Sequence, residues 1–154
     1  MRSEDRLNVA ETVYRYAYGV DTRDFVLYRS IFAEQVAFDF TSFQGGEPVV
    51  MSADQWVAGV RALFTELAAT HHAMTNPLTA IEGDTATCRM YVQAHHVYRA
   101  DDPASWYTIG GYYDDTLVRS VDGPAGWLLT GVTLTVLWRR GDPEIMTQAA
   151  AARG

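Results

Sequence analysis

The sequence predicts an α+β protein in which helices come first and a long antiparallel sheet follows. Apolar residues recur at helical spacing in the first third of the chain, and after Thr70 the apolar period changes to two. The length of 154 residues, of which 48% are apolar, suits one domain with a sizeable core. We therefore expect a single domain over 1–154, with its core at about 7–140 and its helices against one face of a curved sheet that leaves a conical cavity.

Three helices are expected before the sheet. Helical spacing between 7 and 20 predicts the first, and the stretch VDTRD ends it. Asp24 is a candidate N-cap for a short second helix over DFVLYRSIFA. Ser52 with Gln55 three residues later fits a capping box, which starts a third helix over SADQWVAGVRALFTEL. Between the second and third helices, alternation predicts a strand over VAFDFTSF, followed by the loop QGGEP.

The rest of the chain predicts four strands, at about 72–81, 85–99, 106–119 and 126–139. They are separated by the turn-forming stretches EGD, ADDPAS and VDGPAG. The final residues, MTQAAAARG, are expected to form a flexible tail without a role.

Composition excludes several classes of function. The net charge of −7 without a basic run argues against nucleic-acid binding. The single cysteine, Cys88, cannot form an intrachain disulfide, and no short HxH or HxxxH spacing supports a metal site. The start of the chain is charged, and no apolar run approaches the roughly 18 residues of a membrane span. We expect a cytoplasmic protein without a membrane partner or metal.

All four histidines lie in two doublets, His71-His72 and His95-His96. Histidine titrates near physiological pH, so the doublets are candidates for catalysis. Alternation along 85–99 places His96 on the apolar face and His95 on the polar face. The same rule makes His72 the inward member of its doublet. Either inward histidine could instead be a hydrogen-bonded core residue, which is the competing interpretation.

Two acidic residues accompany the inward histidines. Alternation along 106–119 places Asp115 between Tyr113 and Leu117 on an apolar face, where a carboxyl must be paired or protonated. Asp21 follows the apolar face of the first helix. The residues expected to line a pocket around these groups are Tyr16, Phe38 or Phe40, Trp56, Met74, Met90, Tyr113, Asp115 and Leu117.

Three segments together resemble the SnoaL-like branch of the nuclear transport factor 2-like superfamily: YAYGVDTRDFVLYRSIFAEQVAFDF, HHAMTNPLTAIEGDTATCRMYVQAHH and GGYYDDTLVRSVDG…GW. The resemblance covers residues from about 7 to 140. It implies a cone-shaped α+β barrel, with three helices against a strongly bent antiparallel sheet and a deep pocket between them. The superfamily includes dehydratases, isomerases, cyclases, epoxide hydrolases and non-catalytic binding proteins, so the fold alone leaves the function open.

Within that superfamily the chain resembles scytalone dehydratase, a cofactor-free enzyme. VDTRDF here is similar to its segment YDSKDW, and FDFTSF to its segment DYRSF. The resemblance implies that Asp21 is a pocket aspartate, that His72 is the general acid/base, and that His96 is the histidine which the aspartate orients. A similar resemblance to bile acid 7α-dehydratase implies pocket roles for Tyr16, Asp21 and His72.

The chain departs from scytalone dehydratase at two pocket positions. The resemblance places Val20 and Phe40 where that enzyme has tyrosines that hold a water on the substrate carbonyl. Neither side chain here can form a hydrogen bond, so Tyr113 or Tyr16 would have to substitute.

The expected function is cofactor-independent acid/base chemistry on a small hydrophobic carbonyl compound, most simply a dehydration. Asp21 would accept a hydrogen bond from His96, His72 would move the proton, and a protonated Asp115 would donate to a developing enolate. A cyclase or isomerase of natural-product intermediates and a non-catalytic small-molecule-binding protein are the alternatives. The aromatic outer face of the predicted sheet, with Tyr91, suggests a homodimer or homotrimer.

Overall fold

The computed structural model describes residues 3–153 and contains the three helices that the sequence predicts, the first of which begins four residues earlier than expected. The three expected helices are α1 (Ser3–Asp21), α2 (Phe25–Ser30) and α4 (Ala53–Thr65). Asp24 caps α2 by accepting the N–H of Leu27 at 2.9 Å, and Ser52 caps α4 by accepting the N–H of Gln55 at 3.2 Å. Both predicted caps are confirmed. Within residues 3–153, the helices are all too short or too polar to cross a membrane.

The segment between α2 and α4 differs from the prediction. Strand β1 (Phe32–Asp39) begins four residues earlier than expected, and the following residues form α3 (Thr41–Gln44), a single helical turn. Asp39 ends the strand because its carboxylate accepts hydrogen bonds from the backbone N–H and the hydroxyl of Thr41. A short strand that the sequence did not predict, β2 (Val49–Ser52), then pairs with β1.

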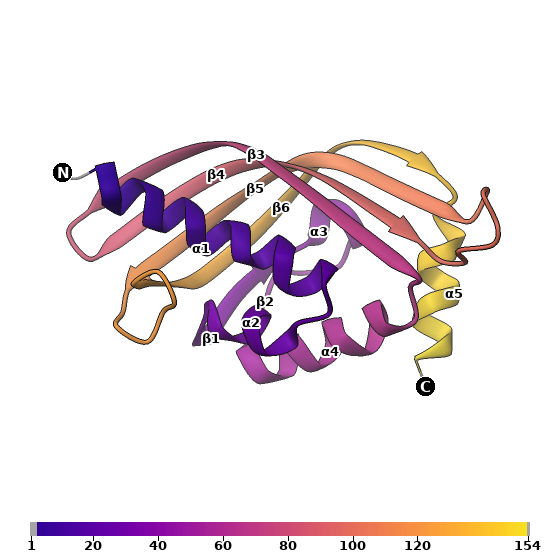
Figure 1. Ribbon diagram of the computed structural model, residues 1–154, viewed down its shortest axis with the longest axis horizontal. Helices are drawn as coiled ribbons and strands as arrows, with labels where there is room; N and C mark the ends of the chain where they lie inside the picture. The colour runs from indigo at the N-terminus through magenta and orange to yellow at the C-terminus, as the bar shows by residue number, and fades with distance from the viewer. Residues whose placement is uncertain (1–2, 154) are drawn as a thin grey trace.

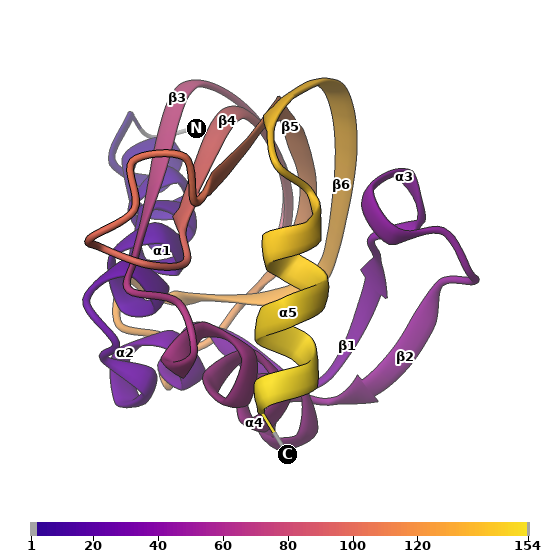
Figure 2. The same cartoon turned by 90° about the vertical axis from the view of Figure 1, so that its right-hand side faces the viewer.

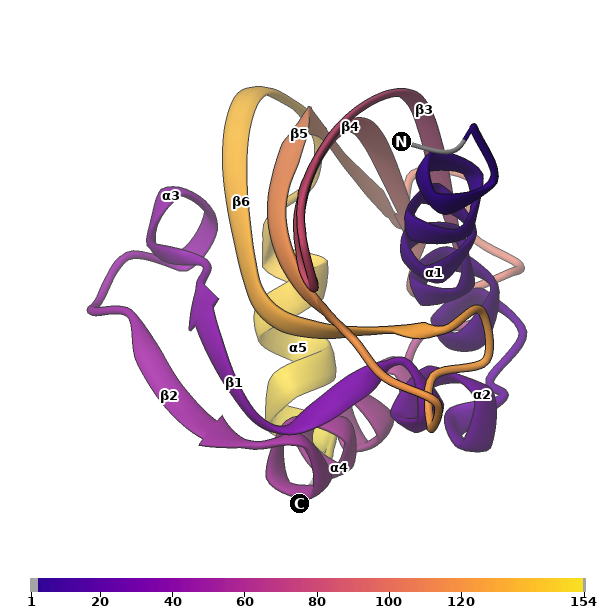
Figure 3. The same ribbon diagram turned by 90° about the vertical axis from the view of Figure 1, so that its left-hand side faces the viewer.

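The predicted meander forms the rest of the sheet. Its strands are β3 (Ala69–Glu82), β4 (Thr85–Val97), β5 (Trp106–Arg119) and β6 (Trp127–Gly141), each antiparallel to the next. The order across the sheet is β2-β1-β6-β5-β4-β3, and β1 runs parallel to β6. Figures 2 and 3 show the four long strands arching over α1 and α5. The predicted α+β class and curved sheet are confirmed, but the sheet is open, with β2 and β3 as its edges, and contains one parallel pair.

Helix α1 occupies one end of the concave face and runs beside the edge strand β3 (Figure 1). Its residues Val9 and Val13 are fully buried, in one core cluster with Met90 and Leu117 of the sheet. Burial of such side chains stabilises the fold by about 1.5–3 kcal/mol each. This core leaves the opposite end of the concave face to a cavity, which α4 and α5 help to close.

The expectation of a flexible tail is wrong for most of its residues. They belong to helix α5 (Glu144–Ala152), which stands at the open side of the sheet (Figure 2). Ile145 and Ala149 are four residues apart on one helical face and are both buried. The alanine-rich sequence favours a helix, and tertiary packing fixes it in place.

Candidate active site

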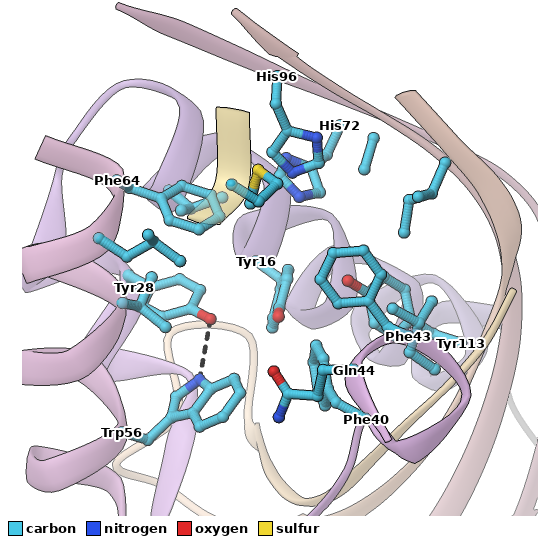
Figure 4. A pocket seen from close by; sticks show the side chains of 17 residues that line it. Tyr16, Tyr28, Phe40, Phe43, Gln44, Trp56, Phe64, His72, His96 and Tyr113 are labelled. Carbon is cyan, nitrogen blue, oxygen red and sulfur yellow. Dashed lines mark hydrogen bonds between the residues drawn. The ribbon is translucent and has the colours of Figure 1, made fainter. Parts of the chain in front are cut away.

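The helices and the concave face of the sheet enclose an apolar cavity of about 110 Å³ (Figure 4). An apolar cavity of about 150 Å³ accommodates benzene in another protein, so this volume suits a ligand of about one six-membered ring. Every helix and four of the six strands contribute to its wall. Seven of its seventeen lining residues are Phe, Tyr or Trp: Tyr16, Tyr28, Phe40, Phe43, Trp56, Phe64 and Tyr113.

The two histidine doublets lie side by side on the adjacent strands β3 and β4, which pair in register. His71 lies opposite His95, and Thr70 lies opposite His96. One histidine pair therefore lies on each face of the sheet. The outer pair is at least partly exposed, whereas His72 and His96 are 8% and 4% exposed and line the cavity. Their ring centroids are 6.1 Å apart. The inward orientation predicted for both residues is confirmed.

His72 is held by Asp21, which lies behind it in a groove between α1 and β3. The Nδ1 of His72 lies 2.7 Å from one carboxylate oxygen, and the backbone N–H of His72 donates to the other at 2.6 Å. A carboxylate accepts, so Nδ1 carries the hydrogen and Nε2 keeps its lone pair on the cavity side. Asp21 therefore fixes both the tautomer and the ring orientation of His72.

The Asp21 carboxylate is itself anchored. The Thr70 hydroxyl donates to it at 2.9 Å, and the Arg23 guanidinium donates to that hydroxyl at 2.7 Å. Burial raises the pKa of Asp21, but the hydrogen bonds from His72 and Thr70 and the electrostatic interaction with the His72 side chain outweigh this, so the pKa lies below its ordinary value. Asp21 is consequently ionised at neutral pH and accepts the hydrogen bond from Nδ1 of His72.

His96 is held differently from the expectation. Its Nδ1 donates to the backbone carbonyl of Tyr107 on β5, at 3.0 Å. The predicted hydrogen bond from His96 to Asp21 is wrong, because the end of α1 reaches the edge strand β3, which carries His72, while His96 lies one strand further in. Both inward imidazoles therefore present Nε2 to the cavity. Among residues 3–153, three or more His, Cys, Asp or Glu side chains are nowhere grouped to hold a metal ion.

The His96 imidazole is expected to remain neutral down to acidic pH. Burial lowers its pKa to about 4, and the nearby imidazole of His72 lowers it too. Titration followed by the NMR signals of the ring, assigned with the His96→Gln variant, should give a midpoint near that value. A midpoint at the ordinary value of 6.5 would show that the ring is solvated and not part of an enclosed site.

Three tyrosine hydroxyl groups lie at the other side of the cavity from the imidazoles (Figure 4). The rings of Tyr28 and Tyr113 lie 5.0 and 5.4 Å from that of Tyr16, measured between centroids. Burial raises the pKa of all three hydroxyls, and the neighbouring hydroxyls raise that of Tyr16 further. All three side chains are therefore neutral and able to donate hydrogen bonds near neutral pH.

Some residues expected in the pocket lie elsewhere. Tyr16, Phe40, Trp56 and Tyr113 line the cavity as predicted. The side chains outside its wall are Met74, which borders the groove beside α1, and Phe38, Met90, Asp115 and Leu117, which are buried in the core. Met90, Asp115 and Leu117 do face inward, but α1 covers that end of the concave face, so they are buried beneath the helix. Phe38 is covered by α4 instead, because its ring stacks on that of Trp56.

Asp115 is a buried acid outside the cavity. It is 4% exposed, and its Oδ1 has no hydrogen-bond partner among the residues that the structure describes. Burial, followed by the charge of Asp114, raises its pKa well above the ordinary value, so the carboxyl is protonated in the folded protein. The predicted contact of Asp115 with a substrate enolate is not supported by this position.

Replacing Asp115 with Asn is expected to stabilise the protein increasingly as pH rises. Above about pH 4 the unfolded chain ionises this carboxyl while the folded chain keeps the proton, so the free energy of unfolding falls with rising pH. Asparagine removes that loss, worth at most about 1.4 kcal/mol per pH unit. Urea unfolding at pH 5 to 8 measures it, with exposed Asp122→Asn as the control. A pH-independent difference between variant and wild type would contradict the prediction.

Several cavity residues are not identified by the sequence patterns. Helical spacing indicates only that Tyr28 belongs to a buried helical face, and the same holds for Phe64. The predicted strand contains Phe43, the predicted loop contains Gln44, and the predicted tail contains Met146. The helical spacing of Tyr28 with Phe25 is the one available signal for Tyr28, and it indicates burial without indicating a cavity.

The fold is that of nuclear transport factor 2-like proteins, and it holds a histidine-containing apolar cavity inside a curved sheet. The chain belongs to the SnoaL-like domain family, whose model matches residues 1–133. Curated protein sequences give no match. The family assignment made from the three sequence segments is therefore confirmed.

Solved structures agree with this assignment. The Kfla4162 protein of Kribbella flavida is 31% identical, with a TM-score of 0.85 over 93% of this chain and 97% of that one. A proposed aromatic ring hydroxylase of Novosphingobium aromaticivorans is 27% identical, with a TM-score of 0.79 over 95% and 99% of the two chains. A proposed scytalone dehydratase of the same species is 17% identical, with a TM-score of 0.75 over 90% and 87%. This last similarity concerns the fold alone.

Proposed function

We propose that this protein is a cofactor-independent acid/base enzyme that removes a proton next to the carbonyl of a small hydrophobic substrate. The observation that carries the proposal is the hydrogen bond between Asp21 and His72, which leaves the second ring nitrogen of His72 facing an apolar cavity. A general base needs an unprotonated nitrogen within reach of the substrate, and this pair supplies one. Asp21 is a positioning residue, because it lies outside the cavity wall.

The reaction begins with transfer of the substrate proton to Nε2 of His72. The electron pair of the broken C–H bond forms a carbon–carbon double bond, and the carbonyl oxygen becomes an enolate. The imidazolium that results is stabilised by the adjacent carboxylate of Asp21. In a dehydration, His72 then returns the proton to a departing hydroxyl group, which leaves as water. In an isomerisation, it returns the proton to another carbon atom.

Dehydration is the more specific form of the proposal. In the sequence resemblance to scytalone dehydratase, Asp21 corresponds to a pocket aspartate and His72 to the general acid/base histidine, and a solved structure with the same fold is a proposed scytalone dehydratase. The size and aromatic wall of the cavity favour a substrate with one ring over a long polyketide chain.

An experiment in heavy water tests the proposal with simple ketones that share the expected substrate chemistry. The protein is incubated in D₂O with a panel of cyclic ketones and β-hydroxyketones of one ring, and NMR follows exchange of the α-hydrogens. Mass spectrometry distinguishes the outcomes, since dehydration loses the mass of water and isomerisation keeps the mass of the substrate. If compounds that bind show no exchange and no product, the protein is a binding protein and the proposal fails.

A further inference from the structure

We infer that Tyr28, positioned by Trp56, forms an oxygen-binding subsite for the carbonyl or enolate oxygen of a single-ring ligand. The inference rests on the proposed function only in naming that oxygen as an enolate. In this inference, Tyr28 takes the role of the two pocket tyrosines of scytalone dehydratase, whose positions are occupied here by Val20 and Phe40. The candidates from sequence alone were Tyr113 and Tyr16, whereas the hydrogen-bond geometry favours Tyr28.

The hydrogen atom of the Tyr28 hydroxyl is directed by the hydrogen bond that Tyr28 accepts. The indole Nε1–H of Trp56 donates to the Tyr28 oxygen at 3.0 Å. An indole nitrogen can donate but cannot accept, so the hydroxyl hydrogen of Tyr28 must point away from Trp56. Figure 4 shows the Tyr28 oxygen on the cavity side of its ring, with Trp56 below it. The hydroxyl hydrogen of Tyr28 is therefore directed toward the interior of the cavity, where hydrogen bonding also links Tyr28 to the hydroxyl of Tyr16.

Packing of neighbouring aromatic rings holds both Trp56 and Tyr28 in place. The Trp56 ring stacks on the ring of Phe38, with centroids 3.8 Å apart and planes inclined by 13°. The Tyr28 side chain is 1% exposed and packs edge-on against Phe32, at 5.1 Å between centroids. A donor held in place before the ligand arrives needs no reorganisation when charge develops on the ligand. The hydrogen bond from Trp56 also polarises the Tyr28 hydroxyl and makes it a stronger donor.

Tyr28 differs from the two neighbouring tyrosines in its hydrogen-bond partners. Tyr16 lies between Tyr28 and Tyr113 and contacts the rings of both, so its hydroxyl has two phenolic neighbours. Tyr28 alone of the three accepts the hydrogen bond from Trp56. Burial raises the pKa of Tyr28, so the group stays protonated and donates throughout the neutral pH range.

The arrangement fits one chemical class of ligand. The imidazoles of His72 and His96 lie on one side of the cavity and the Tyr28 hydroxyl on another (Figure 4). A flat ring with one oxygen substituent can place that oxygen at Tyr28 while it directs a C–H group toward the imidazoles. The ligand class is thus a cyclic enolisable ketone, and phenols imitate the shape of its enol.

Two probes of matched size test the subsite, 4-fluorophenol and 4-fluorotoluene, with binding measured by ¹⁹F NMR. The wild-type protein should prefer the phenol. Tyr28→Phe should lower the affinity for the phenol about tenfold and leave the affinity for the toluene unchanged. Trp56→Phe keeps an aromatic ring for stacking and should lower the preference by a smaller factor. Tyr18→Phe is the control, since Tyr18 is 67% exposed and lies outside the cavity wall.

The outcomes separate this inference from the proposed function. If Tyr28→Phe leaves the preference for the phenol unchanged, or lowers both affinities equally, the subsite does not exist. Failure of the wild type to prefer the phenol overturns the inference as well. If the preference depends on Tyr28 but no ketone exchanges deuterium, the subsite stands and the enolisation chemistry fails.

Discussion

Replacing His72 by glutamine is expected to lower the rate of α-hydrogen exchange by about 10²–10⁴-fold, the usual contribution of a general base. Glutamine fills much of the same space, and its amide oxygen is too weak a base to accept a carbon-bound proton. Deuterium exchange of the best ketone substrate measures the rate. Binding of 4-fluorophenol should remain within a few-fold of the wild-type value, because the oxygen of that probe is bound at Tyr28.

The matched control for this prediction is His71→Gln. It makes the same change one residue earlier, on the outer face of the same strand, where the side chain is exposed and lies outside the cavity wall. Its exchange rate should equal that of the wild-type protein. Equal loss of activity in both variants would show a general effect on β3, and an unchanged rate in His72→Gln would assign the base to another residue.

Replacing Asp21 by asparagine is expected to lower the exchange rate by about 10²-fold or more. The carboxylate accepts hydrogen bonds from Nδ1 and the backbone N–H of His72 and from the hydroxyl of Thr70. An amide that presents its N–H₂ group to Nδ1 favours the opposite tautomer, which puts the hydrogen on Nε2 and removes the base from the cavity. In serine proteases the same substitution costs about 10⁴-fold for this reason.

The Asp21→Asn variant should also lose stability at neutral pH. The pKa of Asp21 is lower in the folded protein than in the unfolded chain, so its ionised form stabilises the fold above the unfolded pKa of about 4. That contribution is lost as pH falls through the folded pKa, and the variants should converge in stability in acid. Thermal unfolding between pH 3 and 7 measures the difference. Asp24→Asn is the control, because asparagine also caps helices; a parallel loss there would contradict the assignment.

Local patterns in the sequence determined the helices α1, α2 and α4, the two side-chain caps and the four-stranded meander. They also determined which histidine of each doublet faces inward. Strand alternation has a fixed period of two, so the relative orientation of His95 and His96 does not depend on what packs against the sheet. The family followed from three sequence segments, and Asp21 and His72 were identified as site residues with it.

Tertiary structure alone decided how those residues combine. The end of α1 reaches β3 before β4, so Asp21 pairs with His72 and not with His96. The placement of α1 on the concave face buries Met90 and Asp115 in the core and leaves the cavity at the other end of the sheet. Tyr28 of α2 and Met146 of α5 line the cavity because these two helices pack over it. Contacts between elements far apart in the chain depend on the angles at which the elements pack, and local sequence periodicity does not predict those angles.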